Sequence, residues 1–471
     1  MGKRKKTPSK SSQPSSIKSQ AMTDANALKL TRCHTEEYDS QLQQKVDAVK
    51  ALIPQAKDAA WEVHASPKTA FRLRCNFQVW HEAEGEKLHY VMYDGDNEKR
   101  TPLRVVDFPR GCAETQRLMP LVLDALRGDD VLRDKCHEVR FHTTLRGSSV
   151  VVLVYNRPID NDKNWKTKAE KLAKELKVVL VGRSSKFRIT LNGDAPRVRE
   201  KLRIAGKDVN LYQLEGEFSQ PNGRVCEKMV TWAARGGVRA SSPHNAVDAQ
   251  VERTQSSKND LLELYCGNGN FTIPMSRNFR KVLATEVSKA NTECARENLT
   301  ANQVKNVQFA RLNAKETADA LQPDARPFKR LTEAAVDLSS LKLETLFVDP
   351  PRAGLEPAAI GLARSFDTVV YVSCNPETLA DDVEQLSHTH DITHAAVFDQ
   401  FPYTRHCEAG VLLKKRSGVD LSTVPEPRAR EKKKSKRYAG KRKGKGKGGG
   451  QAKKGKVEEA ASGGDSGCAV S

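Results

Sequence analysis

The sequence lacks several patterns that would direct its interpretation elsewhere. It contains ten cysteines, but no two are spaced as C-x-x-C, which argues against zinc knuckles and iron–sulfur clusters. No stretch approaches the ~18 consecutive apolar residues of a membrane span. Hydrophobic residues make up only 38% of the 471 residues, so part of the chain is expected to lie outside any packed core. No secretory signal is recognisable, and free thiols in a reducing, intracellular compartment are therefore expected.

Positive charge is concentrated at the two ends. Residues 1–22 carry +6 and residues 417–471 carry +9 of the formal net charge of +20. We predict a disordered basic leader over 1–34 and a disordered Lys/Gly-rich tail over 417–471, because such segments cannot offset the entropy of ordering. Three roles stay open for them: attraction of RNA phosphates, a nuclear import signal, or solubilisation. The leader is Lys/Ser/Pro-rich, which favours cytoplasm or nucleus over an organelle.

The pattern of apolar residues divides the remainder into two domains. Residues 35–215 mix strand-like runs with helical periodicity, including a hairpin signal formed by FRLRCNFQVW and KLHYVMYD. This region is predicted to be α+β. Residues 216–416 contain the short apolar runs LLEL, VLAT, TLFV and VVYVS between helical segments. Such runs are typical of strands buried on both faces of a parallel sheet, so an α/β, doubly wound domain is predicted.

Ligands of such sheets bind beyond the carboxyl ends of the strands, so the residues after each run are informative. YCGNGNF follows the first run, and its Gly267 and Gly269 favour a tight turn that a ligand can approach closely. Glu286 ends the next segment, at a spacing that suits a carboxylate binding a ribose diol. Position 272 is Thr where a dinucleotide fingerprint has Gly or Ala, which favours S-adenosylmethionine over NAD. Alternatively, the glycines form a plain turn and Glu286 lies beside a helix cap.

The third and fourth runs end in DPPRAGL and CNPETL. Two prolines stiffen the loop that presents Asp349 and Arg352. An arginine at the fourth position replaces the aromatic of amino-group methyltransferases, which argues against methylation of an amino group. Cys374 is delivered to the same edge, where its thiol has a possible role as a nucleophile. The alternative is a buried cysteine that only fills space.

These segments together resemble a known family. SQPN, LLELYCGNGNF, LATE, FVDPPRAGL, YVSCNPETL and DQFPYTRHCEAGVLL, in this order, closely resemble the bacterial-type tRNA (uracil-5-)-methyltransferases, the TrmA family. The likeness covers roughly residues 35–415. It implies a Rossmann-like, S-adenosylmethionine-dependent methyltransferase domain preceded by an α+β tRNA-binding domain. It also implies methylation of C5 of the T-loop uridine, position 54, of tRNA.

The resemblance further implies roles for single residues. Cys374 is the expected nucleophile toward C6 of uracil, and Glu408 the expected base that removes the C5 proton. The thiol should therefore have a lowered pKa or a proton acceptor nearby. Cys407 matches no functional position and is expected to be structural. The expected contacts to S-adenosylmethionine are Gln220, Tyr265, Gly267, Asn270, Glu286 and Asp349.

RNA contacts are expected from Arg72 and Arg74, which alternate along one strand, from Phe108 and from Arg352. Phe108 would stack on a base, or else is a core residue. The expected partner is the T-arm of tRNA, with no metal, membrane or obligate protein partner. Two other functions stay open: uracil methylation in ribosomal RNA, and RNA binding or folding with idle catalysis.

Overall fold

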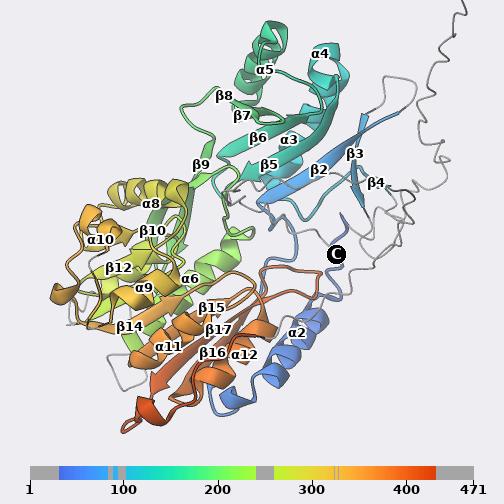
Figure 1. Ribbon diagram of the computed structural model, residues 1–471. Helices are drawn as coiled ribbons and strands as arrows, with labels where there is room; N and C mark the ends of the chain where they lie inside the picture. The colour runs from blue at the N-terminus through green and yellow to red at the C-terminus, as the bar shows by residue number, and fades with distance from the viewer. Residues whose placement is uncertain are drawn as a thin grey trace, which may run out of the picture.

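The computed structural model describes residues 31–82, 88–93, 102–239, 259–322, 324–326 and 328–430. The predictions for residues 1–30 and 431–471 lie outside these ranges. Within them, no helix is long and apolar enough to cross a membrane. Figure 1 shows the helices and strands gathered around two sheets, with a hairpin between them.

A seven-stranded sheet forms the first unit, in the order β4-β3-β2-β5-β6-β7-β8. The predicted hairpin is confirmed, because β2 and β3 pair antiparallel with Gln78 opposite Val91. Helices α3 and α5 cover the sheet, and their buried apolar residues share one core cluster with it. The bounds are β2 Arg74–His81, β3 Leu88–Tyr93, β4 Pro102–Val105, α3 Ala113–Arg127, α4 Asp130–Arg133, β5 Cys136–Thr143, β6 Ser149–Tyr155, α5 Lys163–Leu176, β7 Val179–Ser184 and β8 Phe187–Leu191.

An eight-stranded sheet forms the second unit, in the order β1-β16-β17-β15-β14-β11-β12-β13. All neighbouring strands are parallel except that β17 runs antiparallel to both β15 and β16. The chain order reverses between β11 and β14, which is where doubly wound folds bind ligands. The strands are β1 Ala60–His64, β11 Asp260–Leu264, β12 Val282–Thr285, β13 Val307–Ala310, β14 Leu343–Val348, β15 Thr368–Ser373, β16 His390–Phe398 and β17 Glu408–Lys415.

Helices cover both faces of this sheet, as the apolar runs predict. In β14, Leu346 and Val348 join one core cluster and Phe347 joins the other, because successive side chains point to opposite faces. The first cluster includes residues of α2, α9, α10, α11 and α12, and the second includes residues of α6, α7 and α8. The helices are α2 Tyr38–Leu52, α6 Gly223–Arg239, α7 Thr272–Met275, α8 Lys289–Ala301, α9 Ala314–Ala320, α10 Lys329–Glu333, α11 Pro357–Ser365 and α12 Pro376–Leu386.

Two segments of the region 35–215 pack on the second sheet rather than the first. Strand β1 pairs parallel with β16, Val63 opposite Val397, and Figure 1 shows α2 beside α12. The hairpin of β9 (Arg197–Ile204) and β10 (Lys207–Leu214) contacts α6 and α8 and shares their core cluster. The predicted domain boundaries at residues 35 and 215 therefore do not match the packing of the chain. The segments near both boundaries pack on elements of the second sheet that lie later in the sequence.

The first part of the predicted tail is also placed. Residues 417–430 are described, and the carbonyl of Pro425 accepts a hydrogen bond of 2.6 Å from Arg364 of α11. The backbone N–H of Arg428 donates to Gln385 of α12 at 2.8 Å. The prediction of disorder from residue 417 is thus wrong as far as residue 430, because these contacts lie on helices distant in the sequence.

Candidate active site

Predicted site residues meet at one edge of the eight-stranded sheet. Val348 lies opposite both Leu264 and Tyr371, and Leu264 lies opposite Thr285. The carboxyl ends of β11, β12, β14 and β15 therefore lie side by side. This register brings Tyr265, Glu286, Asp349 and Cys374 to the same edge.

Strand β17 brings Glu408 to this edge from the opposite direction. Because β17 is antiparallel, its first residue lies where its neighbours end: Ser373 pairs with Ala409, and Phe398 pairs with Glu408. Glu408 is thereby next to Cys374 across the strands. Its side chain is buried, at 1% exposure, and its Oε2 has no hydrogen-bond partner among the described residues.

The two loops that carry Asp349 and Cys374 are tied to each other. The carbonyl of Arg352 accepts hydrogen bonds from Asn375 Nδ2 at 3.0 Å and from Thr378 Oγ1 at 3.2 Å. Asn375 also caps α12 by accepting from the backbone N–H of Glu377. The DPPR loop is therefore held against the first turn of the helix that follows Cys374.

Cys374 differs from the other cysteines of the described residues. It is partly exposed, whereas the other eight are buried. Burial, followed by the carboxyls of Glu408 and Asp349, raises the pKa of the Cys374 thiol to about 12, and Arg352 opposes this shift. The expected lowering of the thiol pKa is thus wrong for the free protein, chiefly because burial disfavours the thiolate and, after that, because the nearby carboxyls of Glu408 and Asp349 also disfavour it. The other half of the expectation, a nearby proton acceptor, fits these two carboxyls.

The carboxyls themselves are also shifted. Burial raises the pKa of Asp349 to about 7. Burial, followed by repulsion from Asp349, raises the pKa of Glu408 well above its ordinary value, and Arg352 opposes this shift. Groups whose pKa lies near neutrality are suited to take up and release protons during a reaction.

The glycine turn and Glu286 form a second part of the edge. Glu286 accepts hydrogen bonds from the backbone N–H groups of Gly267, at 3.0 Å, and Ser288, at 2.7 Å. Gly267 has φ +56°, and a Cβ added there would meet no atom within 4 Å. Tyr265, at φ +61°, begins the same turn. The turn therefore faces open space that a ligand can occupy.

Gln220 and Asn270 have polar partners. Gln220 Oε1 accepts a hydrogen bond from Nε2 of Gln400, and both side chains are buried. Gln400 Oε1 has no partner among the described residues. Asn270 Nδ2 contacts Cys226 Sγ at 3.5 Å, on helix α6.

Two residues of this edge were missed by sequence reasoning. Gln400 follows β16 in a segment to which no strand was assigned. Glu263 stands inside the apolar run LLEL, is 1% exposed, and has an unpartnered Oε2 among the described residues. Burial raises its pKa to about 8, with a smaller contribution from Asp349. The presence of an acidic residue within an otherwise apolar strand could have identified Glu263 from the sequence.

Of the predicted RNA contacts, Phe108 is buried, whereas Arg352 is exposed. Phe108 is 3% exposed and packs edge-on against Phe77 at 5.2 Å in the core of the first sheet. The stacking role is therefore wrong in this conformation, and the core alternative holds. Arg352 is exposed, and its guanidinium lies 3.5 Å from His406 Nδ1.

Arg72 and Arg74 are half-buried and serve contacts within the chain. Arg72 Nε donates to the carbonyl of Arg74 at 3.0 Å. Arg74 donates to the carbonyl of Glu217 at 2.7 Å, just before Gln220. Arg74 thus helps to hold the segment that carries Gln220.

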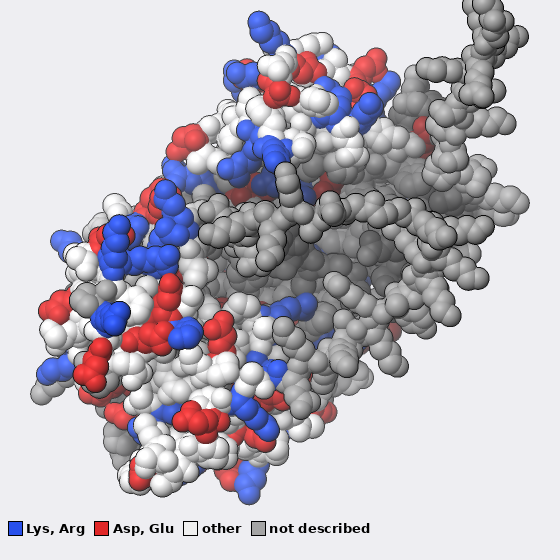
Figure 2. All heavy atoms as spheres, viewed as in Figure 1, with Lys and Arg blue, Asp and Glu red and all other residues white. Residues whose placement is uncertain are grey.

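A hollow of about 780 Å³ lies between α6, the hairpin and the segment after β1, and basic side chains line much of it. Arg203 pairs with Asp208 and Arg224 with Glu227, so these charges are partly balanced. Figure 2 shows a similar mixture over one face, where Lys and Arg are interspersed with Asp and Glu. The body of the protein therefore does not present a single-sign surface on this face.

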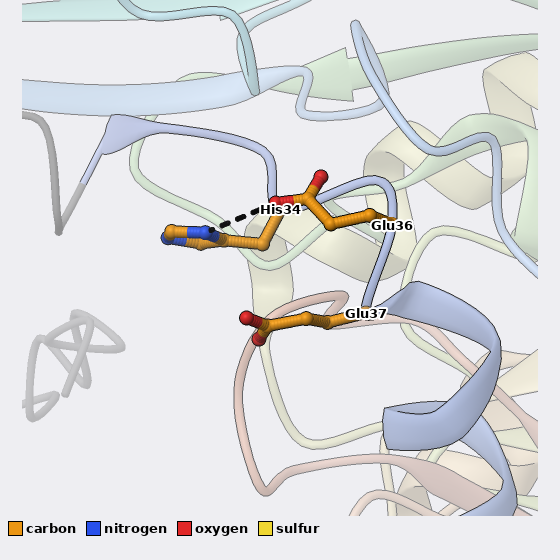
Figure 3. A group of neighbouring side chains, drawn as sticks. All are labelled: His34, Glu36 and Glu37. Atoms are coloured by element: carbon orange, nitrogen blue, oxygen red, sulfur yellow. Dashed lines mark ion pairs between the residues drawn. The ribbon is translucent and has the colours of Figure 1, made fainter.

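One group of side chains has the composition of a weak cation site. His34, Glu36 and Glu37 each offer a ligand atom, and these atoms lie within 4.8 Å of one another (Figure 3). Both glutamates are exposed, and His34 and Glu36 already form an ion pair of 3.8 Å. Exposed acidic groups commonly lie this close without a metal, so no metal site is assigned.

The chain is similar to curated proteins and to a solved structure. Curated relatives named tRNA/tmRNA (uracil-C(5))-methyltransferase include one from Ectopseudomonas mendocina, 45% identical over 80% of this chain and 97% of its own length, and one from Acinetobacter baylyi, 39% identical over 81% and 99%. A solved structure, tRNA (uracil-54, C5)-methyltransferase from Pyrococcus abyssi in complex with S-adenosyl-L-homocysteine, has a TM-score of 0.55 at 18% identity, over 80% of this chain and 83% of that one. At that identity the structural likeness shows a shared fold.

The family model for tRNA (Uracil-5-)-methyltransferase matches residues 37–416. This range contains both sheets and every predicted site residue. The chain therefore belongs to the tRNA (uracil-5-)-methyltransferase family of enzymes.

Proposed function

We propose that this chain methylates C5 of the T-loop uridine, position 54, of tRNA through a covalent bond between Cys374 Sγ and C6 of the base. S-adenosylmethionine is the proposed donor, and it supplies a methyl group on a positively charged sulfur. The observation that carries the proposal is that one partly exposed cysteine, Cys374, lies with the buried carboxyl of Glu408 and the partly buried carboxyl of Asp349 at the carboxyl ends of the parallel strands.

The donor set at this edge fits S-adenosylmethionine. Glu286 is suited to bind a ribose diol, and the open space beside Gly267 leaves room for a ligand against the backbone. The free oxygen of Gln400 supports the proposal that Gln220 and Gln400 together contact a polar group of the donor. Tyr265, Asn270 and Asp349 complete the proposed set.

Uracil C5 is a poor nucleophile, and the covalent route changes that. The Cys374 thiol gives its proton to Asp349, whose pKa of about 7 suits an acceptor near neutral pH. The thiolate adds to C6, and the electron pair of the C5–C6 double bond moves toward C5. C5 then attacks the methyl carbon, the bond between that carbon and the donor sulfur breaks, and S-adenosylhomocysteine leaves as the neutral thioether.

Release of the product reverses the addition. Glu408 removes the remaining proton from C5, the C5–C6 double bond re-forms, and the bond between C6 and Sγ breaks. Glu408 must be ionised at this point, and Arg352, which lowers the pKa of both Glu408 and Cys374, supports this role. Exposed Arg352 is also the proposed contact to the uracil or its phosphate, with half-buried Arg72 and Arg74 as further candidates for phosphate contacts.

A methylation assay on unmodified tRNA transcripts tests the proposal. Cys374→Ala is expected to abolish methyl incorporation, and 5-fluorouridine tRNA is expected to trap a covalent adduct with the wild type, because fluorine cannot leave C5 as a proton does. Cys407→Ala is the matched control, since Cys407 is buried in the core and should keep activity. Near wild-type activity of Cys374→Ala would refute the mechanism.

The position of the modified base is tested separately. A transcript with cytidine at position 54 should accept no methyl group. Mapping of 5-methyluridine in tRNA and ribosomal RNA from a deletion strain then separates the two substrate classes. Loss of 5-methyluridine from ribosomal RNA alone would replace the tRNA proposal.

A further inference from the structure

The segment 425–430 lies beyond the family match, which ends at residue 416. It runs between α11 and α12 and is held along its length. Arg364 of α11 donates to the carbonyl of Pro425, and the ring of Pro427 lies close to Gly361 of the same helix. On the other side, Arg428 bonds to Gln385 and Glu384 of α12.

The segment ends with the guanidinium of Arg430 beside the DPPRAG loop. Arg430 donates to the carbonyl of Ala353 and, at 2.9 Å, to the carbonyl of Thr378 in the first turn of α12. Gly354 allows this approach, because a Cβ at this position would collide with the guanidinium. Arg430 thus links the DPPRAG loop to α12. The hydrogen bonds from Asn375 and Thr378 to the carbonyl of Arg352 link the same loop to the start of this helix.

Arg430 also pairs with a buried acid. Asp382 is 0% exposed, forms an ion pair with Arg430, and accepts hydrogen bonds from the backbone N–H of Leu355 at 2.9 Å and from Tyr371 Oη at 2.7 Å. Leu355 ends the same loop, and Tyr371 lies in β15, three residues before Cys374. Removal of Arg430 would leave the Asp382 carboxylate buried without its cation, which is strongly unfavourable.

We propose that residues 425–430 form a strap whose Arg430 is a positioning residue for the active site. The strap holds the DPPRAG loop against α12 and thereby fixes Asp349 and Arg352 relative to Cys374. Arg430 acts through this loop and does not contact the reacting base. The proposal rests on the proposed function, because it concerns the loop to which that function assigns two roles.

Four proteins test the strap: wild type, Arg430→Ala, Arg430→Lys and Arg428→Ala. The matched control is Arg428→Ala, because Arg428 lies in the same segment, carries the same charge and pairs with an exposed acid, Glu384. At saturating tRNA and donor, and well below each melting temperature, Arg430→Ala should lower kcat by about ten- to a hundredfold, since a small misplacement of catalytic groups has effects of this size. Arg430→Lys should recover part of the loss, and Arg428→Ala should stay within twofold of wild type.

Hydrogen exchange gives a readout that does not depend on activity. The N–H groups of Gly354 and Leu355 are hydrogen-bonded to Pro351 and Asp382. Peptides spanning 349–356 should exchange faster in Arg430→Ala than in Arg428→Ala, while peptides of β11 and β12 stay unchanged. Unchanged exchange of this loop, or a kcat of Arg430→Ala within twofold of wild type, would overturn the strap. An inactive wild type would instead overturn the proposed function, and the exchange experiment would still decide whether the strap holds the loop.

Discussion

At the scale of single residues, burial sets the protonation of the active site. Glu263, Asp349 and Glu408 all have raised pKa values, chiefly because burial disfavours the charged form. Arg352 opposes the shift of Glu408 and of the Cys374 thiol. In the free protein, burial therefore disfavours the ionised forms of both Cys374 and Glu408, the proposed nucleophile and base.

Glu263 provides a test of this electrostatic account. Its carboxyl ionises near pH ~4.3 in an unfolded chain and near pH 8 in the folded protein, so the folded state binds more protons between these values. Raising the pH therefore favours unfolding, by at most about 1.4 kcal/mol per pH unit from this group. Glu263→Gln cannot ionise, and its stability relative to wild type should improve between about pH 5.5 and 8.

Denaturant unfolding of both proteins at the two pH values measures this difference. The exposed substitution Glu293→Gln serves as the control and should show no such trend. If the stabilities of Glu263→Gln and wild type differ by the same amount at both pH values, the carboxyl does not carry a raised pKa.

The sequence predicted the positions of residues at strand ends better than the positions of residues elsewhere. Cys374 and Glu286 lie directly after β15 and β12, as the ends of the apolar runs predicted. Glu263 was missed because it stands within such a run, and Gln400 because it follows β16, a strand that was not predicted. Phe108 was assigned to RNA, although an aromatic in a loop gives no indication of which way it faces. It faces the core.

At the scale of elements, the antiparallel strand β17 is what brings Glu408 into the candidate active site. The parallel strands deliver their carboxyl ends to the edge, and only an antiparallel strand can bring its first residue there. Glu408 and Cys374 thus meet although they leave the sheet in opposite directions along the chain. The antiparallel pairing of β17 was not predicted, because its residues are as apolar as those of a parallel strand.

The turn between β11 and α7 offers a second test. Gly267→Ala should cost about 1 kcal/mol of stability, because a side chain is unfavourable at φ +56°. Its methyl group would also extend into the open space proposed for the donor. We therefore expect a higher KM for S-adenosylmethionine and little change in KM for tRNA.

Gly418→Ala is the matched control for this substitution. Gly418 has φ +73°, and a Cβ added there also meets no atom within 4 Å. It should lose similar stability without a change in KM for the donor. Equal KM values for the two variants would remove the glycine turn from the donor site.

Element types were largely predictable, whereas their partners were not. The predicted strands over 71–93 and the four apolar runs all occur. Strand β1 lies within the region 35–215 that was predicted to be one domain, yet it pairs with β16 of the other sheet, more than three hundred residues later in the chain. The periodicity of apolar residues indicates which face of a helix or strand is buried. It does not indicate which other element packs against that face.

At the scale of the whole molecule, much of the positive charge lies in the C-terminal tail, away in sequence from the candidate active-site residues. Attraction of RNA by the tail can therefore be tested separately from catalysis. The tail after residue 430 contains the run from 432 to 456, with Lys and Arg and no acid. We predict that a chain ending at residue 430 keeps kcat but binds tRNA less tightly at low salt. The slope of log K against log salt should also become shallower, by about 0.7–0.9 for each phosphate that the tail neutralises in the full chain.

Filter binding across a salt series measures this slope. Replacement of 432–456 by a Gly/Ser segment of equal length separates charge from length, and it should behave like the truncation. If wild type and both variants show the same slope of log K against log salt, the tail does not contribute to RNA binding through its charge.

The position of Arg430 also affects the order in which the protein matures during translation. Every strand of both sheets has been synthesised by residue 415, yet the side chain that fastens the DPPRAG loop is added fifteen residues later. A nascent chain thus completes its framework before it can finish its catalytic pocket. Premature termination just before this arginine would yield a protein with all its sheets and a poorly working centre.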